Sequence, residues 1–580
     1  MNKIFRLLSM TLVISGALAI QSCDDEESVG PAPIVELDAT SGSNIPGQTV
    51  SITATVDAPN GGESLIVYVN GNEVESFDLA GAKSFEETYE YSIPAEALIG
   101  SGVTIAFQAT DVKGYSSPIA NYVVTVGDPV VTLEGTLTTQ TLVAEQQYLL
   151  KGQVFIPSGA TLTIPAGTVI KGDKASKAVL VVQPGGKLEA NGTAENPVVF
   201  TSAQAAGERD RGDWGGIVML GSAWVNQTAL PAIEGITPSQ TYGNITSPAT
   251  NADHNAGKLS YVRIEYAGIE LTPNNETNSL TFGGVGNGTV VENVQVSYGG
   301  DDGFEWFGGT VNAKHLVSLS TWDDDFDTDF GWAGNVQFAL VVRNPFFADQ
   351  SGSNAFESDN QGNANETPQG AAGYTRGIFS NVTVLGPREI NSRSMSANYQ
   401  HAMHIRRRSA LSIFNSVFSG FRLGLRIDDQ ATLDNMNNST GKLAHNILLV
   451  PGATVIAASS SASDASYVTN IAADATPVKT YWEANNNTTM NGSPAWTADT
   501  NPYAALGLAQ ANFWAAQTSS TYPSNPSFSV TGGTLATGAN FTDAKLAGNS
   551  FFQTVDYKGA FGATDWTDGW AEFQPLNKAY

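Results

Sequence analysis

The feature that most constrains the fold of this chain is an internal repeat of short alternating segments. Residues 294–297 (VQVS) are matched by residues 317–320 (VSLS), and residues 340–343 (LVVR) continue the series at the same interval. Short alternating segments at a period in the low twenties indicate a solenoid, in which each copy buries its apolar side only against its neighbours. The fixed leucine and asparagine pattern of leucine-rich repeats is absent. The repeat therefore predicts an all-β fold, a right-handed parallel β-helix.

Other copies extend this pattern along most of the chain. Residues 159–168 are answered by residues 185–193, with Leu188 in the place of Leu162. Further copies are found at residues 262–266, 381–384, 416–418 and 446–449. We therefore expect the β-helix to occupy residues 128–580.

The segment that precedes the repeat has a different pattern. Short alternating strands are expected at residues 51–56, 65–69, 103–107 and 122–126. Strands in quick succession, separated by turn signals, are typical of a small antiparallel sandwich. Residues 107–114 resemble the late hairpin of immunoglobulin-like spacer domains in bacterial surface proteins. The sequence thus predicts an immunoglobulin-like β-sandwich over residues 31–127, which we interpret as a stalk without a ligand.

Residues 1–22 predict a secretory signal peptide. Lys3 and Arg6 form a short basic region, and residues 7–20 are almost wholly apolar. This apolar run is too short and wrongly flanked for a membrane-spanning helix. Cys23, the only cysteine of the chain, follows closely and resembles the lipidated residue of a bacterial lipoprotein box. We therefore expect cleavage before Cys23 and lipidation of this residue.

An acidic run, residues 24–27 (DDEE), begins the tether expected over residues 23–30. Such a run behind a lipid-bearing cysteine resembles the export signal of Bacteroidota surface lipoproteins. That resemblance implies a lipid anchor in the outer membrane and a protein that faces the cell exterior. The alternative is a solvated acidic linker with no role in sorting.

The charge of the chain excludes some classes of partner. With 28 Lys and Arg against 56 Asp and Glu, the formal net charge is −28. This charge argues against binding nucleic acid or anionic lipid by electrostatic attraction. Once Cys23 is lipidated, no cysteine remains for a disulfide, so stability must come from packing and backbone hydrogen bonds.

Two segments of the repeat region carry a family resemblance. Residues 190–202 (ANGTAENPVVFTS) and residues 557–561 (YKGAF), with Trp566 and Trp570, resemble a family of large Bacteroidota surface lipoproteins. The resemblance covers roughly residues 130–580. It implies a pectin-lyase-like right-handed parallel β-helix and gives little indication of activity, because the roles of this family are mostly unassigned.

The interval that relates residues 294–297 to residues 317–320 also aligns two acidic clusters. Asp301 is matched with Asp324 and Asp302 with Asp325, and matched residues on adjacent coils lie about 4.8 Å apart. Two carboxylates at this distance repel by about 1 kcal/mol in water and by about 3–4 kcal/mol at an effective dielectric constant of about 20. Calcium takes about six to eight oxygen ligands from acidic loops, so a Ca²⁺ ion would relieve this repulsion. The ligands predicted for it are Asp301, Asp302, Asp324, Asp325, Asp327 and Asp329, with Asp323 and Glu305 in the same neighbourhood. The alternative is a solvated acidic ridge.

An enzymatic role for the same carboxylates is a second interpretation. Residues 300–303 (GDDG) are similar to the paired-aspartate motif of β-helical polygalacturonases, in which one carboxyl acts as an acid and another activates water. The candidate catalytic residues are therefore Asp301, Asp302, Asp324 and Asp325. The other motifs of those enzymes are missing, because the chain has no Gly-His-Gly and residues 426–428 (RID) lack the lysine of the sugar-binding triplet.

A polysaccharide lyase would instead need a basic side chain as well as Ca²⁺. Arg406 and Arg408 belong to a run of three arginines that follows His401 and His404, and we interpret them as candidates for binding an acidic sugar. The alternative is an ordinary strand whose arginines point outward.

Trp306 and Trp322 flank the acidic clusters. A sugar ring can stack on the apolar face of an aromatic side chain and hydrogen-bond to carboxylates beside it. Both tryptophans are therefore candidate residues for binding a sugar. The alternative is that they pack inside the coil as plain core.

Our leading hypothesis from the sequence is a lipoprotein of the cell surface that binds a glycan or another polymer without cleaving it. A TonB-dependent transporter is a possible partner for such a protein. Two alternatives remain at this point: a polysaccharide lyase or glycoside hydrolase acting on acidic glycans, and an adhesin or scaffold that binds a protein partner.

Overall fold

The computed structural model describes residues 29–580, apart from residues 128, 145, 273–274, 361–372, 389–393, 451–455, 459–463, 492–505 and 509–521. The predicted signal peptide, Cys23 and the acidic run lie outside the described residues. The chain divides into two compact units, Met1–Pro129 and Val130–Tyr580. Within the described residues, none of the helices has both the length and the apolar character needed to span a membrane.

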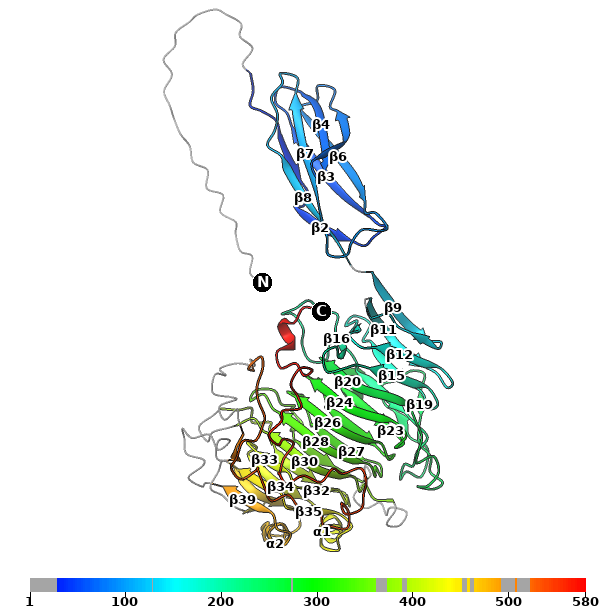
Figure 1. Cartoon of the computed structure of the whole chain (residues 1–580), viewed down its shortest axis with the longest axis vertical. Coiled ribbons are helices and arrows are strands. Elements are labelled where there is room, and N and C mark those ends of the chain that lie inside the picture. Colours follow the sequence, from blue (N-terminus) through cyan, green and yellow to red (C-terminus); the bar gives the residue numbers. More distant parts are fainter. Residues whose placement is uncertain are drawn as a thin grey trace, which may run out of the picture. The chain divides into compact units, whose positions relative to one another are not determined.

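The first unit is a sandwich of two small sheets (Figure 1). The three-stranded sheet contains, in spatial order, β1 (Ile34–Leu37), β3 (Thr49–Asp57) and β6 (Ser84–Ser92). The five-stranded sheet contains, in spatial order, β2 (Ser41–Asn44), β8 (Ala120–Val126), β7 (Gly102–Asp111), β4 (Gly62–Val69) and β5 (Asn72–Asp78).

Alternation along these strands supplies the core of the sandwich. In β3 every second residue is buried, and Ile52 and Val56 meet Val67 of β4 and Phe107 of β7 in one apolar cluster. The predicted β-sandwich is confirmed. All strand pairs in it are antiparallel except β2 with β8, which is parallel.

The second unit is the predicted β-helix. In the described residues its 27 strands form one sheet that winds around an axis (Figure 1). The strands are β9 (Val130–Thr136), β10 (Gln140–Thr141), β11 (Gln147–Ile156), β12 (Thr161–Pro165), β13 (Val169–Gly172), β14 (Val179–Val182), β15 (Lys187–Asn191), β16 (Val198–Ser202), β17 (Ile217–Leu220), β20 (Gly257–Glu265), β23 (Leu280–Gly283), β24 (Val290–Ser297), β25 (Phe304–Phe307), β26 (Asn312–Leu319), β27 (Phe326–Asp329), β28 (Asn335–Val342), β29 (Phe356–Ser358), β30 (Ile378–Leu385), β31 (His401–Ile405), β32 (Ser412–Phe414), β33 (Val417–Ser419), β34 (Leu423–Ile427), β35 (Lys442–Ala444), β36 (Ile447–Val450), β37 (Ile456–Ala458), β38 (Ala465–Thr469) and β39 (Thr488–Asn491).

The remaining helices and strands of the described part of the second unit lie outside this sheet. They are two hairpins, β18 (Ala232–Ile233) with β19 (Gln240–Thr241) and β21 (Ile269–Thr272) with β22 (Asn275–Thr277), two helices, α1 (Gln430–Asn437) and α2 (Thr476–Ala484), and a 3-10 turn at Pro575–Asn577.

Stacked aromatic rings fill the centre of the coil. Phe304, Phe326 and Phe356 lie in register on three successive coils, and all three are fully buried. The ring centroids of Phe304 and Phe326 are 5.7 Å apart, within the range in which aromatic pairs attract one another. Each coil therefore buries its apolar side against the next, as the repeat requires.

One residue per coil makes a bend inside a long strand. Tyr261, Asn293, His315, Phe338 and Asn381 lie in register on five successive coils. Their φ angles are 50°, 56°, 56°, 63° and 59°, a left-handed conformation that costs most for bulky residues. A single bent residue therefore turns the strand without a loop, so no glycine or proline marks the corner in the sequence.

The last stretch of the chain, residues 522–580, adds no strand to the coil. This segment runs back along the outside of the coils, where it is drawn in brown and red in Figure 1. Trp570, Phe561 and Phe528 of this segment pack on Leu319 and Leu340 of the β-helix. Residues 522–580 therefore cover the β-helix and add no coil to it.

Side-chain amides of the coils hold this segment in place. The amide of Gln337 donates to the backbone oxygen of Gln553 at 2.7 Å and accepts its backbone N–H at 2.8 Å. Gln295 makes the same pair of bonds with Glu572, and Asn415 makes it with Asn540. The order of these pairs shows that the segment runs opposite to the succession of the coils.

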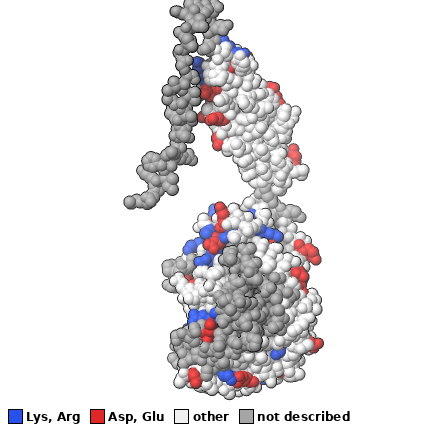
Figure 2. Space-filling view, turned by 90° about the vertical axis from the view of Figure 1, so that its left-hand side faces the viewer, with Lys and Arg blue, Asp and Glu red and all other residues white. Residues whose placement is uncertain are grey.

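Charged side chains are sparse over much of the surface. On the face drawn in Figure 2 they are scattered, and most of the described surface is uncharged. This agrees with a charged fraction of 14% in the sequence. A dense group of carboxylates is therefore a local feature of this molecule.

We predict that Gln337→Ala lowers the free energy of unfolding by about 1–3 kcal/mol, because it removes the two hydrogen bonds to Gln553, and one to Asn381, from a fully buried amide. Gln553→Ala is the matched control, since only the backbone of that exposed residue takes part, and it should change stability by less than about 0.5 kcal/mol. Urea titration measures both. Equal losses in the two variants would show that the amide does not hold the segment.

Candidate functional site

The two acidic clusters lie on adjacent coils, and their pairing is shifted by one residue from the pairing expected from the sequence. Phe304 of β25 lies opposite Phe326 of β27, whereas Val317 of β26 does lie opposite Leu340 of β28 as expected. Val294 of β24 likewise lies opposite Leu316 of β26 and not opposite Val317 as expected, so the strands before and after the acidic clusters both have an interval one position shorter than that between β26 and β28. The expected pairs Asp301 with Asp324 and Asp302 with Asp325 are therefore displaced by one position, which exchanges the inner and outer faces of a strand.

The true register places Asp302 and Asp324 in a ladder of side chains. Oδ1 of Asp302 accepts the backbone N–H of Asp324 at 2.8 Å, and Oδ1 of Asp324 accepts that of Asn354. Asn278 continues the ladder before Asp302, and Asn354 continues it to His401 at 3.0 Å. Each carboxylate thus has one oxygen committed to the adjacent coil, a charge-assisted bond that fixes its direction.

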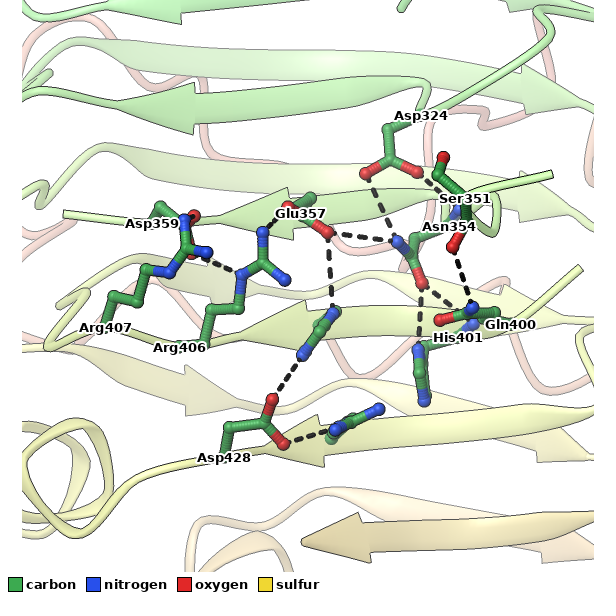
Figure 3. Close-up of polar contacts among 12 residues, drawn as sticks. Asp324, Ser351, Asn354, Glu357, Asp359, Gln400, His401, Arg406, Arg407 and Asp428 are labelled. Atoms are coloured by element: carbon green, nitrogen blue, oxygen red, sulfur yellow. Dashed lines mark hydrogen bonds and ion pairs between the residues drawn. The ribbon is translucent and has the colours of Figure 1, made fainter. Parts of the chain in front are cut away.

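A small cavity of about 180 Å³ opens beside this ladder. Its walls are Asp302, Asp323, Asp324, Asp327, Ser351, Gly352, Glu357, Gln400, His404 and Arg406. We call it the acidic cavity. Figure 3 shows how Asp324, Asn354, Glu357 and Arg406 come from neighbouring coils to meet there.

Carboxylate oxygens in the acidic cavity, together with those of the neighbouring Asp301 and Glu305, lie as close as the ligands of one cation. Oxygens of Asp302, Glu305 and Asp327 all lie within 4.8 Å of one another, and so do those of Asp301, Asp302 and Asp323. Ca²⁺ binds oxygens at about 2.3–2.6 Å, so oxygens on opposite sides of the ion are separated by about this distance. These acidic clusters could therefore hold a metal ion.

Two of these carboxylates have unsatisfied atoms. Oδ1 of Asp323 and Oδ1 of Asp327 are buried, and neither has a hydrogen-bond partner among the described residues. Buried polar atoms nearly always have a partner, which can be a water molecule or an ion. These two oxygens without partners are therefore the strongest indication that the acidic cavity binds an ion or a water molecule.

The electrostatics of the cavity favour protonation when no cation is bound. Burial, followed by the charges of Asp349 and Glu357, raises the pKa of Asp323 to about 7. Burial and the charge of Asp301 raise the pKa of Asp302 well above its usual range, and burial with Glu357 does the same for Asp327. A divalent cation would oppose these shifts, because an opposite charge nearby favours the ionised carboxylate.

Basic side chains form the far wall of the cavity. Arg406 binds both Glu357 and Asp359, and Arg407 binds Asp359 at 2.5 Å (Figure 3). Nε2 of His404 lies 2.8 Å from Asp428, and its Nδ1 lies 3.5 Å from Glu357. The structure thus brings Arg406 to the acidic residues.

Burial lowers the pKa of His404, but hydrogen bonds to Asp428 and Glu357 outweigh burial and raise it. The pKa of Arg406 is likewise raised, because Glu357 and Asp359 outweigh its burial. These acidic partners therefore favour the charged form of both basic groups.

The sequence analysis did not identify Glu357, Asp359 or Asp428. A signal for the first two exists, since residues 356–359 (FESD) repeat the pattern of residues 326–329 (FDTD), with Phe356 opposite Phe326. The interval between these copies is wider than the preceding one, because a longer loop enters the coil, and so the pattern was missed.

Asp325 lies apart from the acidic cavity. It is fully buried, with Oδ1 accepting bonds from Ser318 at 2.6 Å and Thr321 at 3.0 Å and lying 3.4 Å from Nη1 of Arg343. Burial raises the pKa of Asp325 to about 6, although the charge of Arg343 opposes the shift. Its expected place among the metal ligands and catalytic residues followed from the displaced register, and its role is that of a buried ion pair.

Asp329 and Arg408 do not line the acidic cavity either. Asp329 accepts the backbone N–H of Phe330 at 2.7 Å, and the backbone N–H of Arg408 donates to Thr432 at 2.8 Å. We therefore leave both residues out of the site.

The two tryptophans have different positions. Trp306 is fully buried and stacks on Phe282, Phe304 and Trp332, so the alternative reading as core is correct and Trp306 offers no ligand platform. Trp322 is half-buried, and its indole N–H donates to Asp349 at 2.8 Å.

The ring of Trp322 also has a cationic partner. The guanidinium of Arg211 lies 3.6 Å from the ring centroid, which is a cation–π contact. One face of Trp322 is therefore covered by the protein itself.

We predict a pH-dependent stability in the presence of a chelator. The raised pKa of Asp323 means that the folded state holds a proton that the unfolded state has already lost. This stabilisation is complete below about pH 4, where the unfolded aspartate is also protonated, and is lost as the pH rises through about 7. The melting temperature in EDTA should fall over this range, and the fall should be smaller in Asp323→Asn. An identical profile in the variant would contradict the assignment.

Comparisons with known proteins agree with the geometry of the coil. The family described as "Pectate-lyase like beta helix domain" matches residues 135–501. No curated protein matches the chain. A solved structure of fibronectin(III)-like modules of Clostridium thermocellum CbhA is similar at 23% identity, with a TM-score of 0.14, over 16% of this chain and 46% of that chain. This chain thus spans less than half the length of that solved chain. Since the family match covers more than half of its residues, the chain belongs to the family of proteins with a pectate-lyase-like β-helix domain.

Proposed function

We propose that this protein binds an acidic glycan at the acidic cavity through a bound Ca²⁺ ion, without cleaving the glycan. The observation that carries the proposal is the pair of unsatisfied carboxylate oxygens, on Asp323 and Asp327. They face a cavity whose other wall is cationic, with His404 and Arg406 among its lining residues. A hard cation held by such oxygens keeps free coordination positions for oxygens of a ligand.

Calcium is favoured over other cations by the chemistry of the ligands. The candidate ligands are carboxylate oxygens in two groups that share Asp302, one with Asp301 and Asp323 and the other with Glu305 and Asp327. Hard oxygen donors suit Ca²⁺ and Mg²⁺, and irregular surroundings with several carboxylates favour Ca²⁺ over the strict octahedron of Mg²⁺.

Binding is favoured over cleavage by the state of the basic residues. Arg406 is paired with two carboxylates, and His404 lies between two others. Neither side chain is a free base that could remove a proton from a uronate.

The surface location forms part of the proposal. It is supported by the basic and apolar leader before Cys23 and by the acidic run after it. A lipoprotein that holds a glycan at the cell surface fits an uptake system with a TonB-dependent transporter as partner.

We predict that Ca²⁺ raises the melting temperature and permits binding of polygalacturonate, and that EDTA abolishes both effects. A net charge of −28 repels an acidic polymer, so the bridging cation is required, and a ligand bound only by the folded state stabilises it. Asp327→Asn should weaken Ca²⁺ binding at least tenfold by calorimetry. Asp253→Asn, an exposed aspartate outside the cavity, is the control.

Affinity gel electrophoresis with polygalacturonate and alginate then tests the glycan. Retardation that is lost in EDTA supports the proposal. Ca²⁺ binding without retardation on either polymer overturns the glycan part, and release of unsaturated products or reducing ends overturns the non-catalytic part.

We predict further that Cys23 carries lipid. Labelling of growing cells with a palmitate analogue should mark the wild-type protein and leave Cys23→Ser unlabelled, because the Cys23 thiol is the point at which the lipid is attached. An unlabelled wild-type protein would argue against the anchor.

A further inference from the structure

A second cavity lies where the C-terminal segment crosses the bend of the coils. It has a volume of about 280 Å³. His315 and Phe338, two of the left-handed bend residues, meet Tyr557 and Trp566 of the C-terminal segment there. We call it the aromatic cavity.

Four rings enclose this cavity. The rings of His315 and Phe338 are stacked, with centroids 5.3 Å apart and planes inclined by 12°. Trp566 lies 5.1 Å from His315, and Tyr557 lies 6.2 Å from Phe338. Phe338 is only 2% exposed and forms the floor, whereas the other three rings are half-buried.

The polar groups of the cavity carry no formal charge. Among the described residues that line it there is no Lys, Arg, Asp or Glu, and Gln553 and Thr564 provide an amide and a hydroxyl at its exposed side. Burial, followed by the charge of Lys314, lowers the pKa of His315 to about 4, so its imidazole is neutral at neutral pH. The cavity therefore selects against charged ligands.

His315 also has an unsatisfied atom. Its Nδ1 is buried and has no hydrogen-bond partner among the described residues. The nearest carboxylate oxygen, Oε1 of Glu292, is 3.8 Å away, which is too far for a hydrogen bond. A buried ring nitrogen without a partner is available to a polar group of a ligand.

We propose that the aromatic cavity binds one neutral sugar ring, independently of the acidic cavity. The C–H groups of a pyranose face fit the electron-rich faces of aromatic rings, and its hydroxyl groups fit neutral donors and acceptors such as an amide, a hydroxyl and an imidazole. The volume lies just below the range of about 300–1,000 Å³ of typical ligand pockets, so it suits a single ring of a chain. Binding here needs no cation, because no carboxylate takes part.

The substitution Gly562→Ala tests whether the aromatic cavity binds a sugar. A Cβ atom at Gly562 would lie 2.7 Å from Cε1 of Tyr557, so an alanine there pushes the tyrosine ring out of place. Gly532 lies in the same C-terminal segment, and a Cβ atom there meets nothing within 4 Å. Gly562→Ala and Gly532→Ala are therefore a matched pair.

The probes are cellohexaose, mannohexaose, xylohexaose and maltohexaose, titrated in EDTA by calorimetry. At least one should bind the wild-type protein and Gly532→Ala, with affinity reduced at least tenfold in Gly562→Ala. Polygalacturonate binding in Ca²⁺ should stay unchanged in Gly562→Ala, which separates this site from the acidic cavity.

Tyr557→Ala gives a second measurement should Gly562→Ala fold poorly, and the same loss is expected. The proposal is overturned if none of the four hexasaccharides binds in EDTA, or if binding survives both substitutions. Loss of binding on chelation would also overturn it, because the ligand would then sit at the acidic cavity.

Discussion

Hydrogen bonding between adjacent coils is the constraint on which the rest of this structure depends. Along most strands, backbone hydrogen bonds connect one coil to the next and bring equivalent side chains, such as Phe304, Phe326 and Phe356, into register. Beside the acidic cavity the ladder continues through side chains, because Asp302 and Asp324 each accept a backbone N–H from the next coil. A carboxylate fixed in this way cannot turn away from its neighbours. The fold itself therefore concentrates negative charge at this place.

Basic side chains on later coils balance this negative charge, so opposite charges follow one another along the coil axis. Glu305, Asp327, Glu357, His404 and Arg426 lie in register on five successive coils. The row begins with carboxylates and ends with cations. A ligand that lies along the coil axis would therefore meet the cation site first and the basic residues afterwards. An oxygen-rich polymer has the shape and the chemistry to follow such a row.

The sequence allowed the fold to be predicted, because alternation and repetition are properties of neighbouring residues. It predicted the acidic site only in part. Asp302 and Asp327 were identified, but the pairing was displaced by one residue. The interval between β25 and β27 is one position shorter than the interval between β26 and β28, and a single extra residue in one turn leaves no mark in composition. Glu357 was missed for the related reason that loops of different length separate the coils.

Stacking also explains why the two cavities differ in charge. The bend residues Tyr261, Asn293, His315, Phe338 and Asn381 form a row in register. In a row of this kind every side chain faces a neighbour about 4.8 Å away, so like charges repel while aromatic rings and amides attract one another. Rows of neutral side chains are therefore stable by themselves. A row of carboxylates is stable only with protons or a cation, so the acidic cavity is the place where a cation would relieve repulsion between side chains.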